Sequence, residues 1–321
     1  MVESSKRDSG RPAAGSRIGV VGSNMVDLVT YIDRMPEAGE TLAAPSFSMG
    51  HGGKGANQAV AAARLGAEVM FVSRVGDDLF GEGTIRNFQE AGIDARHVRA
   101  VPGTQSGVAP IFVEPSGENR ILIVKGANEH LLPADVEAAA ADLRSCGLIL
   151  LQLEIPLETV YHTIAWAARE GIEVLLNPAP ATPELDVGRV LAATFLVPNQ
   201  TELAIMTGLP TGTREEAERA ARVLVEKGVR TVIVTLGAEG ALLVTAETVR
   251  HVPPVSVRPR DTSGAGDAFI GAFAQHYVRS HDIEAAMAWG AAYAADSITR
   301  PGTQKAFADA ERFEAFRASL P

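Results

Sequence analysis

The segment Asp261–Phe273, DTSGAGDAFIGAF, joins a glycine-rich turn to an apolar helical pattern. Gly264, Ala265 and Gly266 have little side-chain bulk, so a phosphate can approach the backbone N–H groups at this predicted helix N-terminus, where the helix dipole favours an anion. Asp267 would repel a resting phosphate, but it suits a general base that takes a proton from an attacking hydroxyl. The alternative is that Asp267 is only an acidic residue of a first helical turn.

A second glycine-rich segment, GHGGKGANQAVAAARLGA, spans residues 50–67. Its glycines allow close approach of the backbone to a ligand, with Gly53 open to such a contact, while Lys54 and Asn57 offer donors to hydroxyl groups. A tight turn before a helix would explain the same residues. The sequence has neither a G-x-x-x-x-G-K-[ST] loop nor a complete G-x-G-x-x-G fingerprint, which argues against an NAD-dependent oxidoreductase.

A third polar motif, PNQTE, spans residues 198–202. Asn199 and Glu202 are spaced i, i+3, so both would lie on one face of a helix, where they could hold a hydrated Mg²⁺ near phosphates. Asn199 could equally be the N-cap of that helix.

The elements that must position these motifs alternate along the chain. Short, continuously apolar runs are separated by helical patterns, which is typical of a parallel sheet covered by helices. One helix is predicted in detail, because Thr213 and Glu216 form a capping-box pattern and Gly228 stands where that helix should end. The predicted strands are IGVVG (18–22), EVMFVS (68–73), LILLQL (148–153), IEVLLN (172–177), TFLVP (194–198) and TVIVTLG (231–237).

Two regions break the alternation, at about residues 28–50 and 107–125. The second contains a hairpin pattern that turns at Pro115-Ser116-Gly117. We expect both regions to form strands outside the main sheet, as a small β lid or a dimerisation surface. Ordinary edge hairpins are the alternative.

Composition limits the possible classes of function. The chain has 321 residues, 46% of them hydrophobic, and a formal net charge of −10, which argues against a nucleic-acid partner. Its single cysteine, Cys146, excludes an intrachain disulfide and suggests a cytoplasmic protein. Residues 1–15 are polar and are expected to be a disordered extension, with one domain over residues 16–321. No apolar run is long enough to cross a membrane.

Taken together and in this order, the motifs resemble the PfkB or ribokinase family of carbohydrate kinases, from about Arg17 onward. LNPAPA at residues 176–181 and VTLGAEG at residues 234–240 fall between the two glycine-rich signatures, as in that family. The resemblance implies a doubly wound, mostly parallel α/β sheet with helices on both faces, a β lid over the sugar, and a homodimer formed through the lid. It also implies transfer of the ATP γ-phosphoryl group to a sugar, with Mg²⁺ neutralising charge.

The resemblance assigns roles to single residues. Asp267 corresponds to the catalytic base, and Gly264, Ala265 and Gly266 correspond to the anion hole. The implied sugar contacts are Asp27, Gly53, Lys54, Asn57 and Glu154, and the implied nucleotide contacts are Asn199, Thr235, Leu236, Gly237, Gly264 and Gly266. Glu202 would hold Mg²⁺ through water.

Relatives of ribokinase also bind a monovalent cation, usually K⁺, mostly through backbone carbonyls. The matching positions here are Asp261, Ser263, Ser297, Arg300 and Gly302. Ribokinases tend to have a serine near the ion where this chain has Ala306, so the resemblance is weaker at that point.

The sequence GSNMVDL at residues 22–28 resembles the deoxyribokinases of this family, because Met25 replaces the asparagine that faces the sugar 2- and 3-hydroxyls in ribokinases. A thioether would leave a 2-hydroxyl without a partner but would pack against a 2-methylene. The sequence therefore predicts phosphorylation of the 5-hydroxyl of 2-deoxy-D-ribose. If Met25 faced the core and Asn24 contacted the sugar, an ordinary ribokinase would be expected. Another sugar or nucleoside kinase of the same family is a further alternative, and a sensor without catalytic activity is the third possibility.

Overall fold

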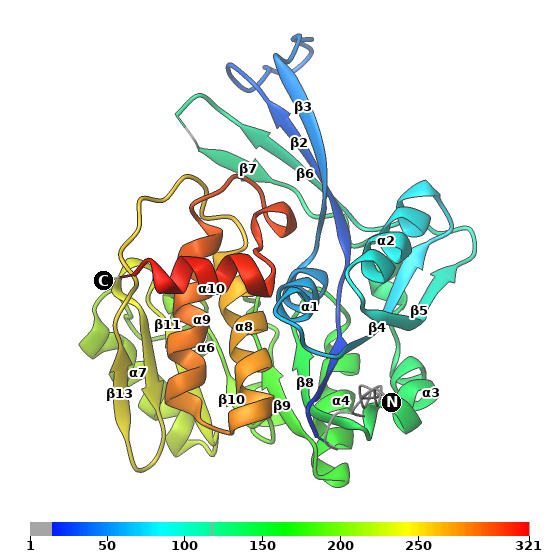
Figure 1. The fold of residues 1–321 in the computed structure, drawn as a ribbon. Coiled ribbons are helices and arrows are strands. Elements are labelled where there is room, and N and C mark those ends of the chain that lie inside the picture. Colours follow the sequence, from blue (N-terminus) through cyan, green and yellow to red (C-terminus); the bar gives the residue numbers. More distant parts are fainter. Residues whose placement is uncertain (1–14, 117, 321) are drawn as a thin grey trace, which may run out of the picture.

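The computed structural model describes residues 15–116 and 118–320, so the predicted N-terminal extension lies almost wholly outside them. The main body contains a nine-stranded sheet in the order β13-β12-β11-β10-β9-β8-β1-β4-β5 (Figure 1). Pairing is parallel from β5 to β11 and antiparallel for β12 and β13. In chain order the strands are β1 (Arg17–Val21), β4 (Val69–Gly76), β5 (Asp94–Val101), β8 (Cys146–Leu151), β9 (Glu173–Leu176), β10 (Phe195–Leu196), β11 (Thr231–Thr235), β12 (Ala241–Val244) and β13 (Val249–Val252).

The six predicted apolar runs form β1, β4, β8, β9, β10 and β11, which confirms the mostly parallel sheet. Their side chains alternate between two cores. Along β8, for example, Leu148 and Leu150 pack on one side of the sheet, whereas Ile149 and Leu151 pack on the other. Strands buried on both faces in this way are expected to be apolar throughout.

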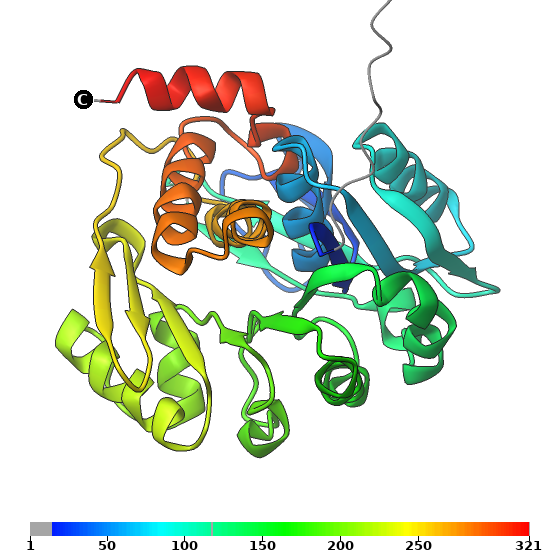
Figure 2. The ribbon, with the colours of Figure 1, turned by 60° about the horizontal axis from the view of Figure 1, so that its bottom comes forward.

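Helices cover both faces of the sheet, as predicted (Figure 2). One face carries α1 (Lys54–Arg64), α2 (Leu79–Glu90), α8 (Ala265–Ser280), α9 (Ile283–Ser297) and α10 (Ala310–Ala318). The other carries α3 (Pro133–Leu143), α4 (Leu157–Glu170), α5 (Val187–Val190), α6 (Gln200–Thr207) and α7 (Arg214–Glu226). The predicted capping box of α7 is present: Thr213 accepts from the Glu216 amide at 3.2 Å, and Glu216 accepts from the Thr213 amide at 3.2 Å.

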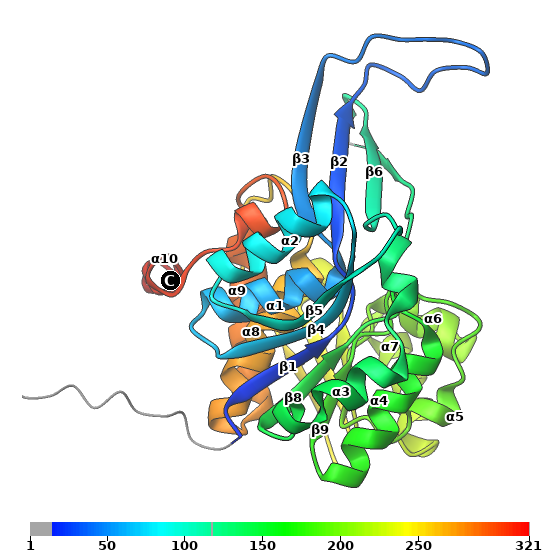
Figure 3. The same cartoon turned by 90° about the vertical axis from the view of Figure 1, so that its right-hand side faces the viewer.

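A second sheet of four strands projects from this body (Figures 1 and 3). Its strands are β2 (Met25–Tyr31), β3 (Ser46–Gly52), β6 (Val108–Val113) and β7 (Asn119–Ile121), in the order β3-β2-β6-β7. Both regions predicted to lie outside the main sheet are in it. The predicted turn is closed by a hydrogen bond of 3.0 Å from the Glu114 amide to the Glu118 carbonyl, and its Gly117 lies outside the described residues.

The sheet order reverses direction beside β1. The chain proceeds from β1 to β4 and β5 on one side and from β8 to β11 on the other, which opens a crevice at the carboxyl ends of these strands. Within the described residues, no helix combines the length and the apolar character that crossing a membrane requires.

Candidate active site

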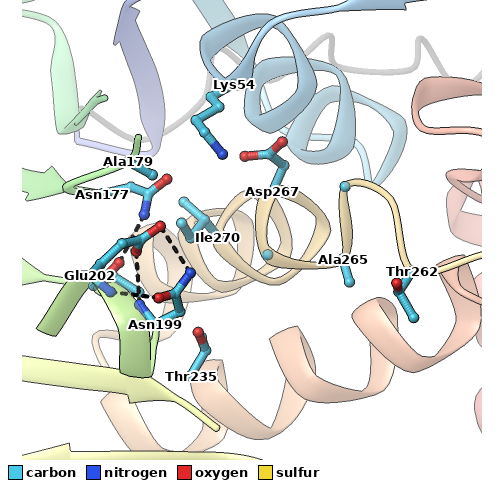
Figure 4. A pocket seen from close by; sticks show the side chains of 13 residues that line it. Lys54, Asn177, Ala179, Asn199, Glu202, Thr235, Thr262, Ala265, Asp267 and Ile270 are labelled. Carbon is cyan, nitrogen blue, oxygen red and sulfur yellow. Dashed lines mark hydrogen bonds between the residues drawn. The ribbon is translucent and has the colours of Figure 1, made fainter. Parts of the chain in front are cut away.

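A cavity of about 180 Å³ lies at this crevice, between the N-termini of α1, α6 and α8 (Figure 4). The side chains of Lys54 and Asp267 point toward one another across it, and Glu202 with Asn199 forms the opposite wall. Three candidate groups from distant parts of the sequence thus meet around one small space. They are the base, the phosphate-binding glycines and the magnesium-binding residue. The sequence motifs supply five more lining residues, which are Thr235, Thr262, Gly264, Ala265 and Gly266.

The glycine-rich turn forms the N-terminus of α8, as predicted. Gly264 is the N-cap with φ of +73°, a left-handed conformation that favours glycine. The Ala265 amide donates to the Thr262 carbonyl at 3.2 Å, so the first-turn amides of Gly266 and Asp267 are better placed to bind an anion than that of Ala265.

The carboxylate of Asp267 is buried, with 6% of the residue exposed, and both of its oxygens accept hydrogen bonds from α1. Asn57 Nδ2 donates to Oδ2 at 2.9 Å, and Gln58 Nε2 donates to Oδ1 at 3.0 Å. Two amide donors, one to each oxygen, fix the orientation of the carboxylate. Gln58 was not predicted, although a long polar side chain in an alanine-rich buried helix was a signal for it.

Glu154 lies beside the start of α1 and is 4% exposed. Its Oε2 accepts from Ser23 Oγ at 2.6 Å and from the Lys54 amide at 2.8 Å. Burial raises the pKa of Glu154, although the Ser23 hydrogen bond and the Lys54 charge oppose the shift. Burial also disfavours the Lys54 ammonium, but Asp267, Glu154 and Glu202 together outweigh it and raise the pKa of Lys54. The positively charged Lys54 side chain thus lies among several carboxylates.

Asp27 and Met25 lie two positions apart on β2, so they share one face of the strand. The Asp27 carboxylate packs against Gly52, where an added Cβ would lie only 2.2 Å from Oδ1. Burial, followed by the charges of Glu154 and Asp267, raises the pKa of Asp27 to about 7. Gly53 has φ of +89°, and a Cβ there would lie 2.7 Å from Asn24 Cα, so glycine is needed for this close approach.

Asn24 and Met25 point in different directions. Asn24 Nδ2 donates to Ser73 Oγ at 2.9 Å and to the Arg74 carbonyl at 2.8 Å, so its amide is held against β4. Met25 is 2% exposed, yet it belongs to neither of the two hydrophobic cores of the described residues. Met25 pairs in the small sheet with Gly52, which has no side chain. The methionine is therefore the side chain presented on the Asp27 face.

Asn199 and Glu202 form a reciprocal capping box at the start of α6. Asn199 Oδ1 accepts from the Glu202 amide at 2.8 Å, while Glu202 accepts from the Asn199 amide at 2.8 Å and from Asn199 Nδ2 at 2.9 Å. The N-cap interpretation of Asn199 is confirmed. Glu202 is only 8% exposed but lines the cavity, and burial raises its pKa. A single carboxylate suits a Mg²⁺ ion that keeps most of its waters, and the described residues contain no cluster of three or more metal-binding side chains.

A larger cavity of about 670 Å³ adjoins the first and shares Asn199, Thr235 and Gly266 with it. Gly237 lines it, whereas the Leu236 side chain is buried in the core, so only the backbone of Leu236 could face a ligand there. Sequence analysis missed the apolar wall of this cavity because short apolar residues in loops and helices look like ordinary core. That wall contains Val255, Val257, Pro259, Phe269, Ala291, Ala294 and Ile298.

The predicted cation-binding positions lie in two adjoining loops. Asp261 Oδ2 accepts from the Gly302 amide at 2.7 Å, and Oδ1 accepts from the Ser263 amide at 2.9 Å. Ser297 Oγ donates within α9 to the Ala294 carbonyl, and the Arg300 guanidinium pairs with Asp296. The Arg300 guanidinium has no lone pair for a cation, so only its backbone carbonyl could serve as a ligand, whereas Ser297 Oγ donates its proton and keeps its lone pairs.

Comparisons with known proteins identify the family to which the chain belongs. The sequence matches the pfkB family carbohydrate kinase pattern over residues 16–310. The deoxyribokinase of Salmonella typhi is 54% identical over 299 residues, which cover 93% of this chain and 98% of that protein. The ribokinase of Haemophilus influenzae is 38% identical, with coverage of 89% and 93%. Among solved structures, Arabidopsis thaliana ribokinase complexed with ribose and ATP superimposes with a TM-score of 0.87 at 30% identity, covering 94% of this chain and 98% of that one. The chain therefore belongs to the pfkB family of carbohydrate kinases.

Proposed function

We propose that this ATP-dependent sugar kinase transfers the γ-phosphoryl group of ATP to the 5-hydroxyl of 2-deoxy-D-ribose and releases 2-deoxy-D-ribose 5-phosphate. The observation that carries the choice of sugar is the placement of Met25 beside Asp27 on β2, while the Asn24 amide is held by Ser73 and Arg74. The 54% identity to a deoxyribokinase supports the same choice.

In this proposal Asp267 takes the proton from the sugar 5-hydroxyl as that oxygen attacks the γ-phosphorus. The hydrogen bonds from Asn57 and Gln58 keep the carboxylate oriented while leaving lone pairs for the hydroxyl. The glycine-rich turn at residues 264–266 lets the transferring group approach the start of α8, where the amides of Gly266 and Asp267 stabilise its negative charge. Lys54, whose ammonium points toward Asp267, adds a positive charge to the cavity (Figure 4).

Mg²⁺ neutralises phosphate charge when it is bound, and Glu202 is the residue that would hold it through water. The nucleotide would extend from the first cavity into the larger one, with Thr235 and Gly237 beside its phosphates and ribose. The apolar wall formed by Val255, Ala291 and Ile298 suits a purine ring.

Asp27 and Glu154 would accept hydrogen bonds from the sugar hydroxyls, and Gly53 and Lys54 would contact the ring through backbone and side chain. Met25 has no strong hydrogen-bonding group to offer a 2-hydroxyl, so binding ribose would leave that hydroxyl desolvated and without a partner. Because an apolar pocket rejects an added hydroxyl only modestly, we expect a preference for deoxyribose of at most about a hundredfold.

A K⁺ ion between the segment with Asp261 and Ser263 and the segment with Ser297, Arg300 and Gly302 is a further part of the proposal. The hydrogen bond from the Gly302 amide to Asp261 joins the two segments, which supports it. Backbone carbonyls of such loops are suitable K⁺ ligands.

We also propose a homodimer formed through the small sheet, which would act as a lid. Phe47, Met49 and Leu122 are 58%, 50% and 61% exposed. Strand alternation and register place Phe47 and Met49 on the face opposite Asp27, so a second copy of the chain could cover them without blocking the sugar site.

Assays with ATP and Mg²⁺ on 2-deoxy-D-ribose and D-ribose test the function, with the product identified by NMR. A 5-phosphate of deoxyribose, formed with the higher kcat/KM, is expected. Preference for ribose would indicate a ribokinase, and absence of turnover with every pentose would indicate a sensor.

A further inference from the structure

Gln304 is a buried residue outside the predicted site, 5% exposed, in the short helix η3 (Gln304–Ala306) that follows α9. Its Nε2 donates to Asn57 Oδ1 at 3.0 Å, and its Oε1 accepts from Asn87 Nδ2 at 2.9 Å. Asn57 in turn donates to Asp267. Three amides therefore connect α2, η3 and α1 in series and end on the carboxylate.

The direction of this chain of amides is fixed. An amide group has a carbonyl that only accepts and an NH₂ that only donates. Because Gln304 donates to the carbonyl of Asn57, the NH₂ of Asn57 must face Asp267, and a flipped Asn57 would place its carbonyl against the carboxylate. Without Gln304, the carboxylate alone would hold that orientation, and the Asn57 carbonyl would lose its buried donor.

The segment around Gln304 also contacts two other parts of the site. The Gly302 amide donates to Asp261. A Cβ added to Gly264 would lie only 2.4 Å from Thr303 Cγ2, so this segment packs on the start of α8. Lys305 Nζ donates to the Met49 carbonyl of β3 at 3.1 Å. The segment at residues 302–305 therefore connects the anion-binding turn, the small sheet and the candidate base.

We propose that Gln304 is a positioning residue for phosphoryl transfer, which orients Asp267 through Asn57 and so couples the position of segment 302–305 to the base. This role rests on the proposed function of Asp267. Gln304 lines neither of the two cavities described above, so its loss should lower kcat and leave the KM for ATP near its native value.

A double-mutant cycle tests the proposal on whichever pentose the native enzyme phosphorylates. Gln304→Met keeps most of the side-chain volume but removes both hydrogen bonds, and it should lower kcat by about tenfold or more, since small misplacements of catalytic groups are costly. In an Asn57→Ala background, where the chain of amides is already cut, the same substitution should change kcat by less than about twofold. Equal losses in both backgrounds would overturn the proposal.

Gln304→Glu supplies an independent comparison. Glutamate has nearly the shape of glutamine and can still accept from Asn87, but in its ionised form it only accepts, so it should compete with Asp267 for the Asn57 NH₂. We expect a larger loss of kcat for Gln304→Glu than for Gln304→Met, whereas a packing role predicts the opposite order. Melting temperatures of the single variants identify losses due to unfolding. Failure of the proposed function appears separately, as a native enzyme that does not phosphorylate pentoses.

Discussion

Replacing Asp267 with asparagine removes the proposed base at nearly constant shape. Positioned general bases contribute about 10²–10⁴-fold in rate, which corresponds to about 2.7–5.5 kcal/mol in the activation free energy. We therefore expect Asp267→Asn to lower kcat by at least about a hundredfold. The other groups around the sugar, including Asp27 and Glu154, stay in place, so sugar affinity should change little.

The surroundings of Asp267 add a second effect. Asn57 Nδ2 and Gln58 Nε2 both donate to the carboxylate, but an asparagine offers only one accepting oxygen, so one of the two contacts would become donor against donor. Gln58 cannot flip freely, because Gln152 Nε2 donates to its Oε1 at 2.6 Å. An unmatched buried donor costs about 1–3 kcal/mol, so the variant should also unfold at a lower temperature than the native protein.

Steady-state kinetics, sugar binding by calorimetry and thermal unfolding separate the two effects. The prediction is a large loss of kcat, nearly native sugar affinity and a moderate decrease in Tm. Turnover close to native would remove Asp267 from the chemistry. An unchanged Tm would contradict the arrangement of amides around it.

Three further predictions follow from the site and the small sheet. Burial and nearby carboxylates raise the pKa of Asp27 to about 7, so Asp27 should be largely protonated at pH 6 and ionised at pH 8. The KM for the sugar should therefore fall about tenfold between these pH values. An equally steep pH dependence of KM in Asp27→Asn would refute this. Exchanging K⁺ for tetramethylammonium should lower both kcat and Tm, and unchanged values would argue against a cation at Asp261. Phe47→Glu should convert a dimer into a monomer in sedimentation, and a native protein that sediments as a monomer would exclude the proposed interface.

Much of the fold follows from local sequence patterns. The central strands are continuous apolar runs, and α7 begins at a capping box that is complete within four residues. Strand β5 was missed because Arg96, His97 and Arg99 interrupt its apolar residues. Strands β12 and β13 have four residues each and continue the sheet in antiparallel fashion, which the alternation of strands and helices does not predict.

Sequence patterns pointed to candidate residues in glycine-rich and capping motifs, whereas contacts between residues far apart in the sequence were missed. Gln58 lies 209 positions from Asp267, and Gln304 lies 247 positions from Asn57. Neither glutamine belongs to a local pattern that announces its partner, so only the packing of α1 against α8 and η3 reveals the chain of amides.

The choice of sugar depends most directly on Met25. The decisive measurement is the ratio of kcat/KM for 2-deoxy-D-ribose to that for D-ribose, in the native enzyme and in Met25→Asn. We predict a native ratio above one and a shift of about tenfold or more toward ribose in the variant, because an asparagine amide would supply the missing partner for the 2-hydroxyl. A native preference for ribose, or a ratio that does not change on substitution, would contradict the role of Met25.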